Sequence, residues 1–159
     1  NYAHTYLAKL EKKKNLTIIT QNIDGLHQIA GSKNVVELHG SIHRNYCEKC
    51  AKLYSLKEIL NMSNVPYCTK CGGLIKPDVV LYGEPLNELV MTKAIIALQE
   101  ADLLIVAGTS LKVYPAASLI DYFYGDNIVI INKEKLEVHR KIKLQINKSI
   151  AEVFKEIDE

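Results

Sequence analysis

Arginine, cysteine and long apolar runs are scarce in this 159-residue sequence, and each scarcity excludes a kind of function. Arg44 and Arg140 are the two arginines, so the bidentate clamps that proteins prefer for phosphate groups are few. The net charge of +2 is too small to indicate a nucleic-acid or anionic-membrane surface. No run approaches the roughly 20 apolar residues of a membrane-spanning helix. The sequence therefore predicts no nucleic-acid partner and no membrane partner.

Signals for export and for disulfide formation are also missing. The four cysteines all lie in two C-x-x-C pairs, and no signal peptide is evident at the N-terminus. We therefore expect a reducing, cytoplasmic environment. The sequence starts at Asn1 with residues that already have helical spacing, which predicts that the chain begins inside a larger protein.

Almost half of the residues are apolar, and they alternate along the chain between strand and helix patterns. Unbroken apolar runs predict short strands at 16–20, 35–38, 79–81, 103–107 and 128–131. Helical spacing predicts helices at 3–13, 56–60, 86–100, 115–124 and 150–157. Strands of this kind, alternating with helices, are typical of a parallel sheet that is buried on both faces. We therefore expect an α/β fold.

Small or polar residues follow four of the predicted strands. They are Gln21 and Asn22 after the first strand, His39 after the second, Gly108, Thr109 and Ser110 after the strand at 103–107, and Asn132 after the strand at 128–131. Ligands of parallel α/β sheets bind at the carboxyl ends of the strands. We therefore expect a binding site along this edge.

The four cysteines have the spacing of a zinc site, C-x2-C-x17-C-x2-C, with Cys47 and Cys50 in the first pair and Cys68 and Cys71 in the second. Two thiolates three residues apart hold a metal ion from one tight turn, and the second pair completes a tetrahedron. Four thiolates leave no position for water, so the sequence predicts a structural Zn²⁺. The alternative is four unrelated buried or redox thiols.

The cysteine segment at 44–77 carries mixed charges. Its lysines stand beside Glu48 and Glu58, which is typical of a solvated surface. A zinc ribbon that binds nucleic acid uses a basic stripe with aromatic residues, and this segment does not have that pattern.

The polar residues at the strand ends also have structural explanations when each is taken alone. Asp24 would cap a short helix that runs to Ile29. A lone histidine at a strand end, such as His39, is more often packed than catalytic. The turn at 108–110 offers backbone N–H groups to a phosphate, but it also matches a common loop.

Seven segments, taken in order, resemble the sirtuins, the family of NAD-dependent protein deacylases. They are TQNIDGLH at 20–27, AGS at 30–32, ELHGS at 37–41, the four cysteines, KPDVVLYGE at 76–84, GTSLKVYPAA at 108–117 and VIIN at 129–132. The pattern is most similar to the bacterial branch of the family. The resemblance implies a Rossmann-like parallel sheet with helices on both faces, plus a small four-cysteine zinc-ribbon module. It divides the chain into an NAD-binding domain at 1–43 and 78–159 and a zinc-binding module at 44–77.

The resemblance assigns the strand-end residues to catalysis and to NAD. His39 matches the family's catalytic base, which activates a hydroxyl of the NAD ribose. The expected cofactor residues are Gln21 and Asn22 at the nicotinamide ribose, Ile23 and Asp24 at nicotinamide, Gly108, Thr109 and Ser110 at ribose and phosphate, Asn132 and Lys133 at the adenosine ribose, and Ser149 and Ile150 at adenine.

The resemblance also implies where an acyl-lysine peptide binds. Val79, Val80, Tyr82, Gly83 and Glu84 match the strand that pairs with the peptide, and Val113 joins Val80 and Tyr82 along the acyl-lysine tunnel. The family usually has Phe at the position of Tyr82, whose hydroxyl needs a hydrogen-bond partner if it is buried. The implied partners are acyl-lysine proteins or peptides, and the implied products are deacylated lysine, nicotinamide and O-acyl-ADP-ribose.

Sirtuins carry a Gly-rich turn and a loop, before the matched segments, that hold the pyrophosphate of NAD. The resemblance therefore implies that the parent protein is the deacetylase and that this piece alone is inactive. One alternative is a zinc-stabilised module that holds a peptide or a nucleotide without catalysis, and another is mono-ADP-ribosyl transfer. His39, Asn22 and Asp24 favour the deacylase over the binding module and leave ADP-ribosyl transfer open.

Overall fold

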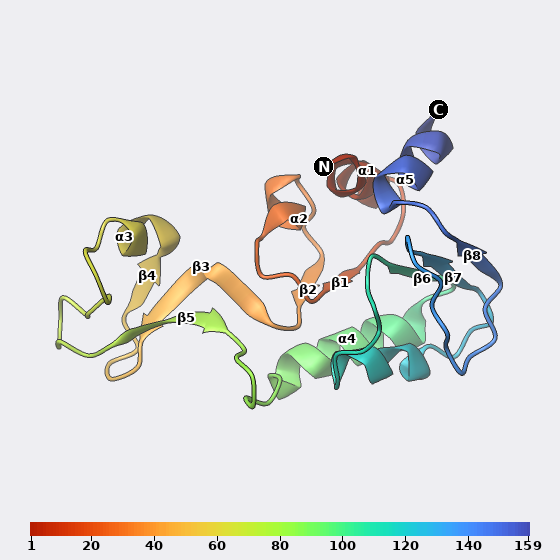
Figure 1. Ribbon diagram of the computed structural model, residues 1–159. Helices are drawn as coiled ribbons and strands as arrows, with labels where there is room; N and C mark the ends of the chain where they lie inside the picture. The colour runs from red at the N-terminus through yellow and green to blue at the C-terminus, as the bar shows by residue number, and fades with distance from the viewer.

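The computed structural model describes all 159 residues, and Figure 1 shows parallel strands at its centre and right, with an antiparallel unit extending to the left. The helices are α1 Tyr2–Glu11, α2 Leu26–Ile29, α3 Leu56–Leu60, α4 Glu88–Glu100 and α5 Ile150–Asp158, with a 3-10 helix η1 at Ala116–Tyr122. The strands are β1 Ile18–Thr20, β2 Val35–Glu37, β3 Gly40–Cys47, β4 Leu53–Ser55, β5 Ile75–Val79, β6 Leu104–Ala107, β7 Ile128–Ile131 and β8 Leu144–Ile146. No helix combines the length and the apolar character that crossing a bilayer requires.

The parallel strands form two sheets. β1 pairs with β2, and β7 pairs with both β6 and β8, all in parallel. No ladder of hydrogen bonds joins β1 or β2 to the second sheet. The expected α/β fold with parallel strands is confirmed, and the structure adds that its strands are divided between two sheets.

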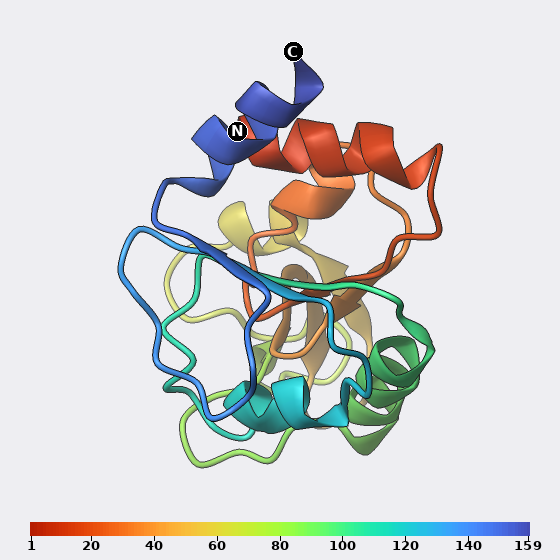
Figure 2. The same cartoon turned by 90° about the vertical axis from the view of Figure 1, so that its right-hand side faces the viewer.

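Helices cover the parallel strands from two sides. In Figures 1 and 2, α1 and α5 lie together above the strands, whereas α4 and η1 lie below them. Phe123 and Ile128 are fully buried on the side of α4 and η1. Phe154 of α5 is buried on the other side, where its ring stacks on Tyr6 with 4.9 Å between ring centroids. The sheets are therefore covered from both sides, most completely at β7, which explains why Ile128, Ile130 and Ile131 form an unbroken apolar run with Val129.

The antiparallel unit has the strand order β4-β3-β5 and carries the cysteines. The pairing of β3 with β5 shifts between Ser41 and Asn45, so residues 42–44 form a bulge on the β5 side. The predicted domain limits at 43/44 and 77/78 fall within β3 and β5. The two strands thus run without interruption from the parallel part into the zinc-binding segment, and the division into domains stays a prediction.

Most of the predicted helices are present with small changes at their ends. The helices predicted at 3–13, 56–60, 86–100 and 150–157 are confirmed as α1, α3, α4 and α5. The side chain of Asn87 accepts hydrogen bonds from the N–H groups of Leu89 and Val90, which explains why α4 begins at Glu88. The helix predicted at 115–124 is instead a 3-10 helix that follows Pro115.

Two strand predictions need correction. The strand predicted at 79–81 shares only Val79 with β5, which begins earlier, at Ile75, and ends before the chain turns back on itself between Leu81 and Glu84. In that turn Glu84 N–H donates to the carbonyl of Leu81 (3.0 Å), and the Glu84 carboxylate accepts from Leu81 N–H (2.9 Å). The short edge strand β8 was missed, because its three residues follow the charged Lys143 and form no apolar run.

Candidate active site and metal centre

The carboxyl ends of β1 and β2 meet at His39. The half-buried His39 ring approaches the carbonyl oxygen of Gln21, with 3.1 Å between Nδ1 and that oxygen. A carbonyl oxygen accepts only, so Nδ1 carries a proton, and the neutral form of the ring has its lone pair at Nε2. The backbone carbonyl of His39 accepts from Val80 N–H at 3.1 Å. The structure thus brings together the predicted base, one predicted cofactor residue and the start of the predicted peptide segment.

The loop after β1 is held in place by its own side chains. Thr20 Oγ1 accepts from Asn22 N–H (3.1 Å), and Asp24 Oδ1 accepts from Leu26 N–H (3.0 Å) at the start of α2. Asp24 thus makes the hydrogen bond of an Asx-turn just before α2, whose N-cap residue is Gly25 without a side-chain cap. Ile23 and Asp24 are half-buried and Asn22 is exposed, so the three side chains remain candidates for a nicotinamide site.

The carboxyl ends of β6 and β7 form a second group. Gly108 donates its N–H to the carbonyl of Ile131 (3.1 Å), with a left-handed φ of 60°. A Cβ atom at this position would lie 2.7 Å from the Ile150 side chain, so only glycine fits here without a shift. Asn132 N–H donates to the carbonyl of Ile146 (3.1 Å), beside the same strand ends.

Other members of the predicted adenosine site are engaged locally. Ser149 caps α5, because its Oγ accepts from Glu152 N–H at 3.3 Å. Asn132 donates from Nδ2 to the carbonyl of Glu134 (2.9 Å), and Thr109 Oγ1 accepts from Leu111 N–H (3.1 Å). Ser110 and Lys133 are exposed. No hydrogen bond joins this group to the His39 group, so their joint action in one site stays a prediction.

The predicted peptide segment begins where β5 pairs with β3. Val79 lies opposite Gly40, which follows His39 directly. The backbones are so close that a Cβ at Gly40 would lie 1.9 Å from the carbonyl oxygen of Asp78. Tyr82 and Gly83 are exposed at the turn, and Val113 is half-exposed. The acyl-lysine tunnel expected between Val80, Tyr82 and Val113 therefore stays a prediction.

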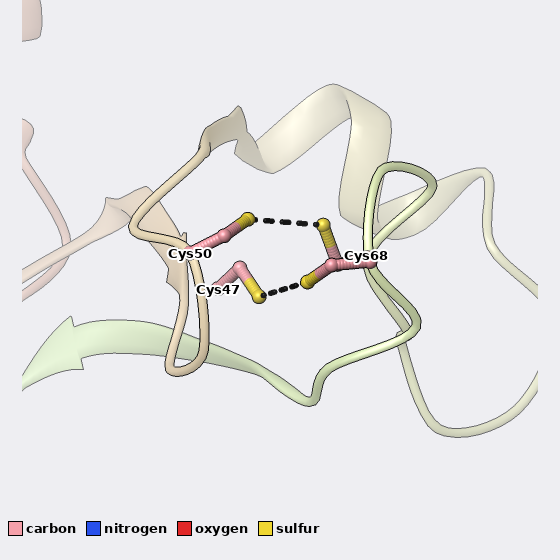
Figure 3. Close-up of side chains that lie close together, drawn as sticks. Cys47, Cys50 and Cys68 are labelled. Carbon is pink, nitrogen blue, oxygen red and sulfur yellow. Dashed lines mark hydrogen bonds between the residues drawn. The ribbon is translucent and has the colours of Figure 1, made fainter.

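The four cysteine side chains converge at the far end of the antiparallel unit. Their Sγ atoms all lie within 4.8 Å of one another, and Figure 3 shows Cys47, Cys50 and Cys68 pointing into one space. The Cys47–Cys71 and Cys50–Cys68 sulfur distances are 3.5 and 3.6 Å. Tetrahedral Zn²⁺ with Zn–S bonds of about 2.3 Å requires sulfur separations of about 3.8 Å. The residues therefore fit one zinc ion with a closed shell, remote from His39 in the fold.

The protonation of the thiols also fits a cation site. A hydrogen bond from the Tyr54 hydroxyl, 3.2 Å long, lowers the pKa of Cys68 to about 6. The Gly73 amide lowers the pKa of Cys71, but hydrogen bonding with the other thiols and burial outweigh it and raise that pKa to about 12. Neighbouring thiols thus share their protons unequally, and a divalent cation would allow all four to be thiolates.

Two residues near the His39 group, His43 and Arg44, were not predicted from the sequence. In the β3 bulge, His43 Nε2 donates to the carbonyl of Asp24 (2.9 Å), while Arg44 bonds to Glu37 and to Asp78. A cavity of about 200 Å³ lies between these side chains and α2. The sequence shows Arg44 only as one of two arginines, because its partners lie 7 and 34 residues away and leave no local pattern.

The fold and site together define an α/β protein with polar strand ends of the nucleotide-binding type and a four-thiolate zinc centre. The sequence model described as "Sir2 family" matches residues 1–115. The chain belongs to the Sir2 family.

Similar proteins agree with this assignment. An NAD-dependent protein deacetylase of Clostridium perfringens is 58% identical over 156 residues, which are 97% of this chain and 64% of the relative. The Clostridium tetani protein of the same name is 55% identical and is covered to 63%. The chain therefore spans a little less than two thirds of the length of these relatives.

Solved structures have the same fold. A structure described as "Sir2 bound to acetylated peptide" matches 99% of this chain and 68% of its own, with a TM-score of 0.91 and 42% identity. One described as "Sir2-p53 peptide-NAD+" has a TM-score of 0.90 and 41% identity, with the same coverage. At 41–42% identity, these structures share the family of this chain as well as its fold.

Proposed function

We propose that the intact protein is an NAD-dependent protein-lysine deacylase. The observation that carries the proposal is the environment of His39, whose Nε2 is free and whose backbone is joined to the first residues of the peptide segment. The proposed base and the proposed peptide strand are thus held next to each other by a backbone hydrogen bond. The relatives named NAD-dependent protein deacetylases, and a structure with an acetylated peptide, support the same activity.

The strand ends supply suitable groups for NAD. Gln21, Asn22 and Asp24 offer amide and carboxylate groups near His39, and Gly108 offers a close backbone approach near Ile150. NAD supplies an ADP-ribosyl group that takes the acyl group as nicotinamide leaves. The remaining residues proposed for the cofactor are Ile23, Thr109, Ser110, Asn132, Lys133 and Ser149.

His39 acts as the general base in this proposal. It accepts a ribose hydroxyl proton at Nε2, while the Nδ1–H bond to the Gln21 carbonyl keeps the ring in one orientation. A histidine with a lone pair near neutral pH suits that role. Asp24 accepts from the nicotinamide carboxamide, using the carboxylate oxygen that is not bonded to Leu26 N–H.

An acyl-lysine peptide suits the segment that begins at Val79. An extended peptide pairs with backbone groups of Val79, Val80, Tyr82, Gly83 and Glu84, so affinity depends little on peptide sequence. The lysine amide is neutral, so an apolar channel beside Val113 accepts it and excludes charged lysine, which would lose its hydration there. The substrates we propose are therefore acyl-lysine proteins.

The proposal includes the zinc ion and the location of the enzyme. Zn²⁺ on Cys47, Cys50, Cys68 and Cys71 stabilises the segment at 44–77, while the residues at 1–43 and 78–159 hold NAD. Four free cysteines suit a reducing cytoplasm.

The proposal is tested by incubating the intact protein with an acetyl-lysine peptide, with and without NAD. We expect the peptide to lose its acetyl group only when NAD is present. Transfer of ADP-ribose to the peptide, without loss of acetyl, would favour mono-ADP-ribosyl transfer, and retention of the peptide unchanged would leave a binding module. Either result would overturn the proposed deacylation.

A further inference from the structure

The bulge of β3 joins the ends of two other strands through a single side chain. Arg44 donates from Nε to Asp78 Oδ2 (2.8 Å) at the end of β5. It donates from Nη1 to Glu37 Oε2 (2.7 Å) at the end of β2. Gln28 of α2 donates to the other oxygen of Glu37 at 2.8 Å. One guanidinium therefore spans β2, β3 and β5, which no other hydrogen-bonded side chain here does.

The two carboxylates stand directly beside the proposed active-site segments. Glu37 is two residues before His39, and Asp78 is one residue before Val79. The backbone already links these segments through the Val80 N–H bond to His39. Arg44 supplies a second, side-chain link between the same two segments. The backbone bond joins their last residues, His39 and Val80, whereas Arg44 joins their first residues, Glu37 and Asp78.

The energetics favour a geometric role over a stabilising one. The side chains of Arg44 and Asp78 are 52% and 47% exposed, and pairs of that exposure contribute little to folding stability. The Glu37 side chain is only 10% exposed, so its carboxylate depends on Arg44 and Gln28 for hydrogen bonds. Removing Arg44 would leave the Glu37 carboxylate with one hydrogen-bond donor, Gln28, and the end of β2 would be held less firmly.

We propose that Arg44 is a positioning residue that fixes the distance between His39 and the peptide-binding segment. The inference rests on the proposed deacylase function and adds to it the residue that aligns peptide with base. Lysine cannot replace it fully, because one ammonium group does not match the fork that reaches both carboxylates.

The test compares Arg44→Gln, Arg44→Lys, Asp78→Asn and the double variant Arg44→Gln/Asp78→Asn in the intact protein. We expect Arg44→Gln to raise the KM for acetyl-lysine peptide by about tenfold, because small misplacements of a substrate cost up to about 10²-fold. The KM for NAD stays within about twofold, since Arg44 bonds to none of the residues proposed for the cofactor. Arg44→Lys should be intermediate.

The double variant shows whether Arg44 acts through Asp78. We expect its peptide KM to be no higher than that of Arg44→Gln, because both changes remove one interaction. Lys9→Gln is the matched control, since the Lys9 side chain is 56% exposed and its pair with Asp158 lies on α1 and α5. It should leave both KM values unchanged.

Amide exchange at Val80 gives a readout that does not need activity. We expect faster exchange in Arg44→Gln than in the wild type, and no change in Lys9→Gln, because the Val80–His39 bond would open more often. Unchanged exchange and an unchanged peptide KM in Arg44→Gln would overturn the proposal. A double variant whose increase in peptide KM equals the product of the two single increases would also overturn it, because Arg44 and Asp78 would then act independently. A wild type without deacetylation would contradict the proposed function, while the exchange rate would still decide the role of Arg44.

Discussion

His39 keeps one ring nitrogen on the Gln21 carbonyl and presents the other to the proposed ribose site. We expect His39→Ala in the intact protein to cut deacetylation by about 10²–10⁴-fold, the usual contribution of a general base. Thermal stability should change little, since the ring is only half-buried. Initial rates with saturating NAD and peptide measure the effect.

His139→Ala is the control for this prediction. His139 is exposed and pairs with Asp121 away from the strand ends, so its loss should leave the rate unchanged. A His39→Ala variant that deacetylates at the wild-type rate would remove His39 from the catalytic role.

Asp24 has one observed role, in the turn that leads into α2, and one predicted role, at nicotinamide. Asp24→Asn keeps an oxygen that accepts from Leu26 N–H, so stability should be nearly unchanged, whereas Asp24→Ala should lose about 1 kcal/mol of unfolding free energy. If the carboxylate also binds nicotinamide, both variants lose NAD cleavage. Melting temperature and nicotinamide release separate the two roles, and full activity in Asp24→Asn would leave Asp24 with its role in the turn alone.

At the residue scale, the sequence predicted what local spacing encodes and missed what the fold brings together. The C-x-x-C pairs predicted a cluster that the structure confirms. The Asx-turn at Asp24 was also predicted, because its hydrogen bond joins residues two apart, but the N-cap residue of α2 is Gly25. Arg44 was missed, because its bonds to Glu37 and Asp78 depend on a bulge in β3 that has no sequence signature.

The antiparallel unit is the element whose stability should depend on metal. We expect one Zn²⁺ per chain, and we expect Tyr54→Phe to weaken its binding by about 10–100-fold, because loss of a hydrogen bond to a ligand commonly has that effect. Competition with a chelator measures the affinity. Tyr46→Phe is a matched control, because none of the hydrogen bonds to the cysteine sulfurs comes from Tyr46.

The zinc prediction has a clear contrary result. Metal binding and folding of the unit are coupled, so Cys68→Ser should both lose metal and expose the segment at 44–77 to proteolysis. Well under one equivalent of zinc in a normally folded wild type would contradict it.

The α2 helix carries a pH-sensitive contact. Burial, followed by the nearby charge of His4, lowers the pKa of His27, and the two rings lie 4.6 Å apart. The unfolded state therefore takes up a proton more readily, and unfolding free energy falls as pH drops below about 6.5. In His27→Gln this loss should be smaller between about pH 7.5 and pH 5.5. Urea titrations at both pH values measure it, and an identical loss in wild type and variant would contradict the argument.

Elements were predicted well where their residues form a long pattern. α4 and α5 repeat their apolar spacing over two turns or more, and both are present. β3, β4, β8 and most of β5 were not predicted, because each of these strands is defined by its pairing with another strand of the fold. Short edge strands take their pairing from the fold, so periodicity alone does not locate them.

The whole molecule combines two parallel sheets with one antiparallel unit, and only the alternation of strands and helices was visible in the sequence. That alternation predicted the α/β class because parallel strands need crossover helices. The split into two sheets was not predictable, since ladders between distant strands leave no trace in local spacing.

The central claim is that acyl groups move from lysine to ADP-ribose. The direct measurement is the product stoichiometry of the intact protein with NAD and an acetyl-lysine peptide, determined by mass spectrometry. We predict one nicotinamide and one O-acetyl-ADP-ribose for each lysine deacetylated. Release of free acetate without consumption of NAD, or nicotinamide release with the acetyl-lysine intact, would contradict the account.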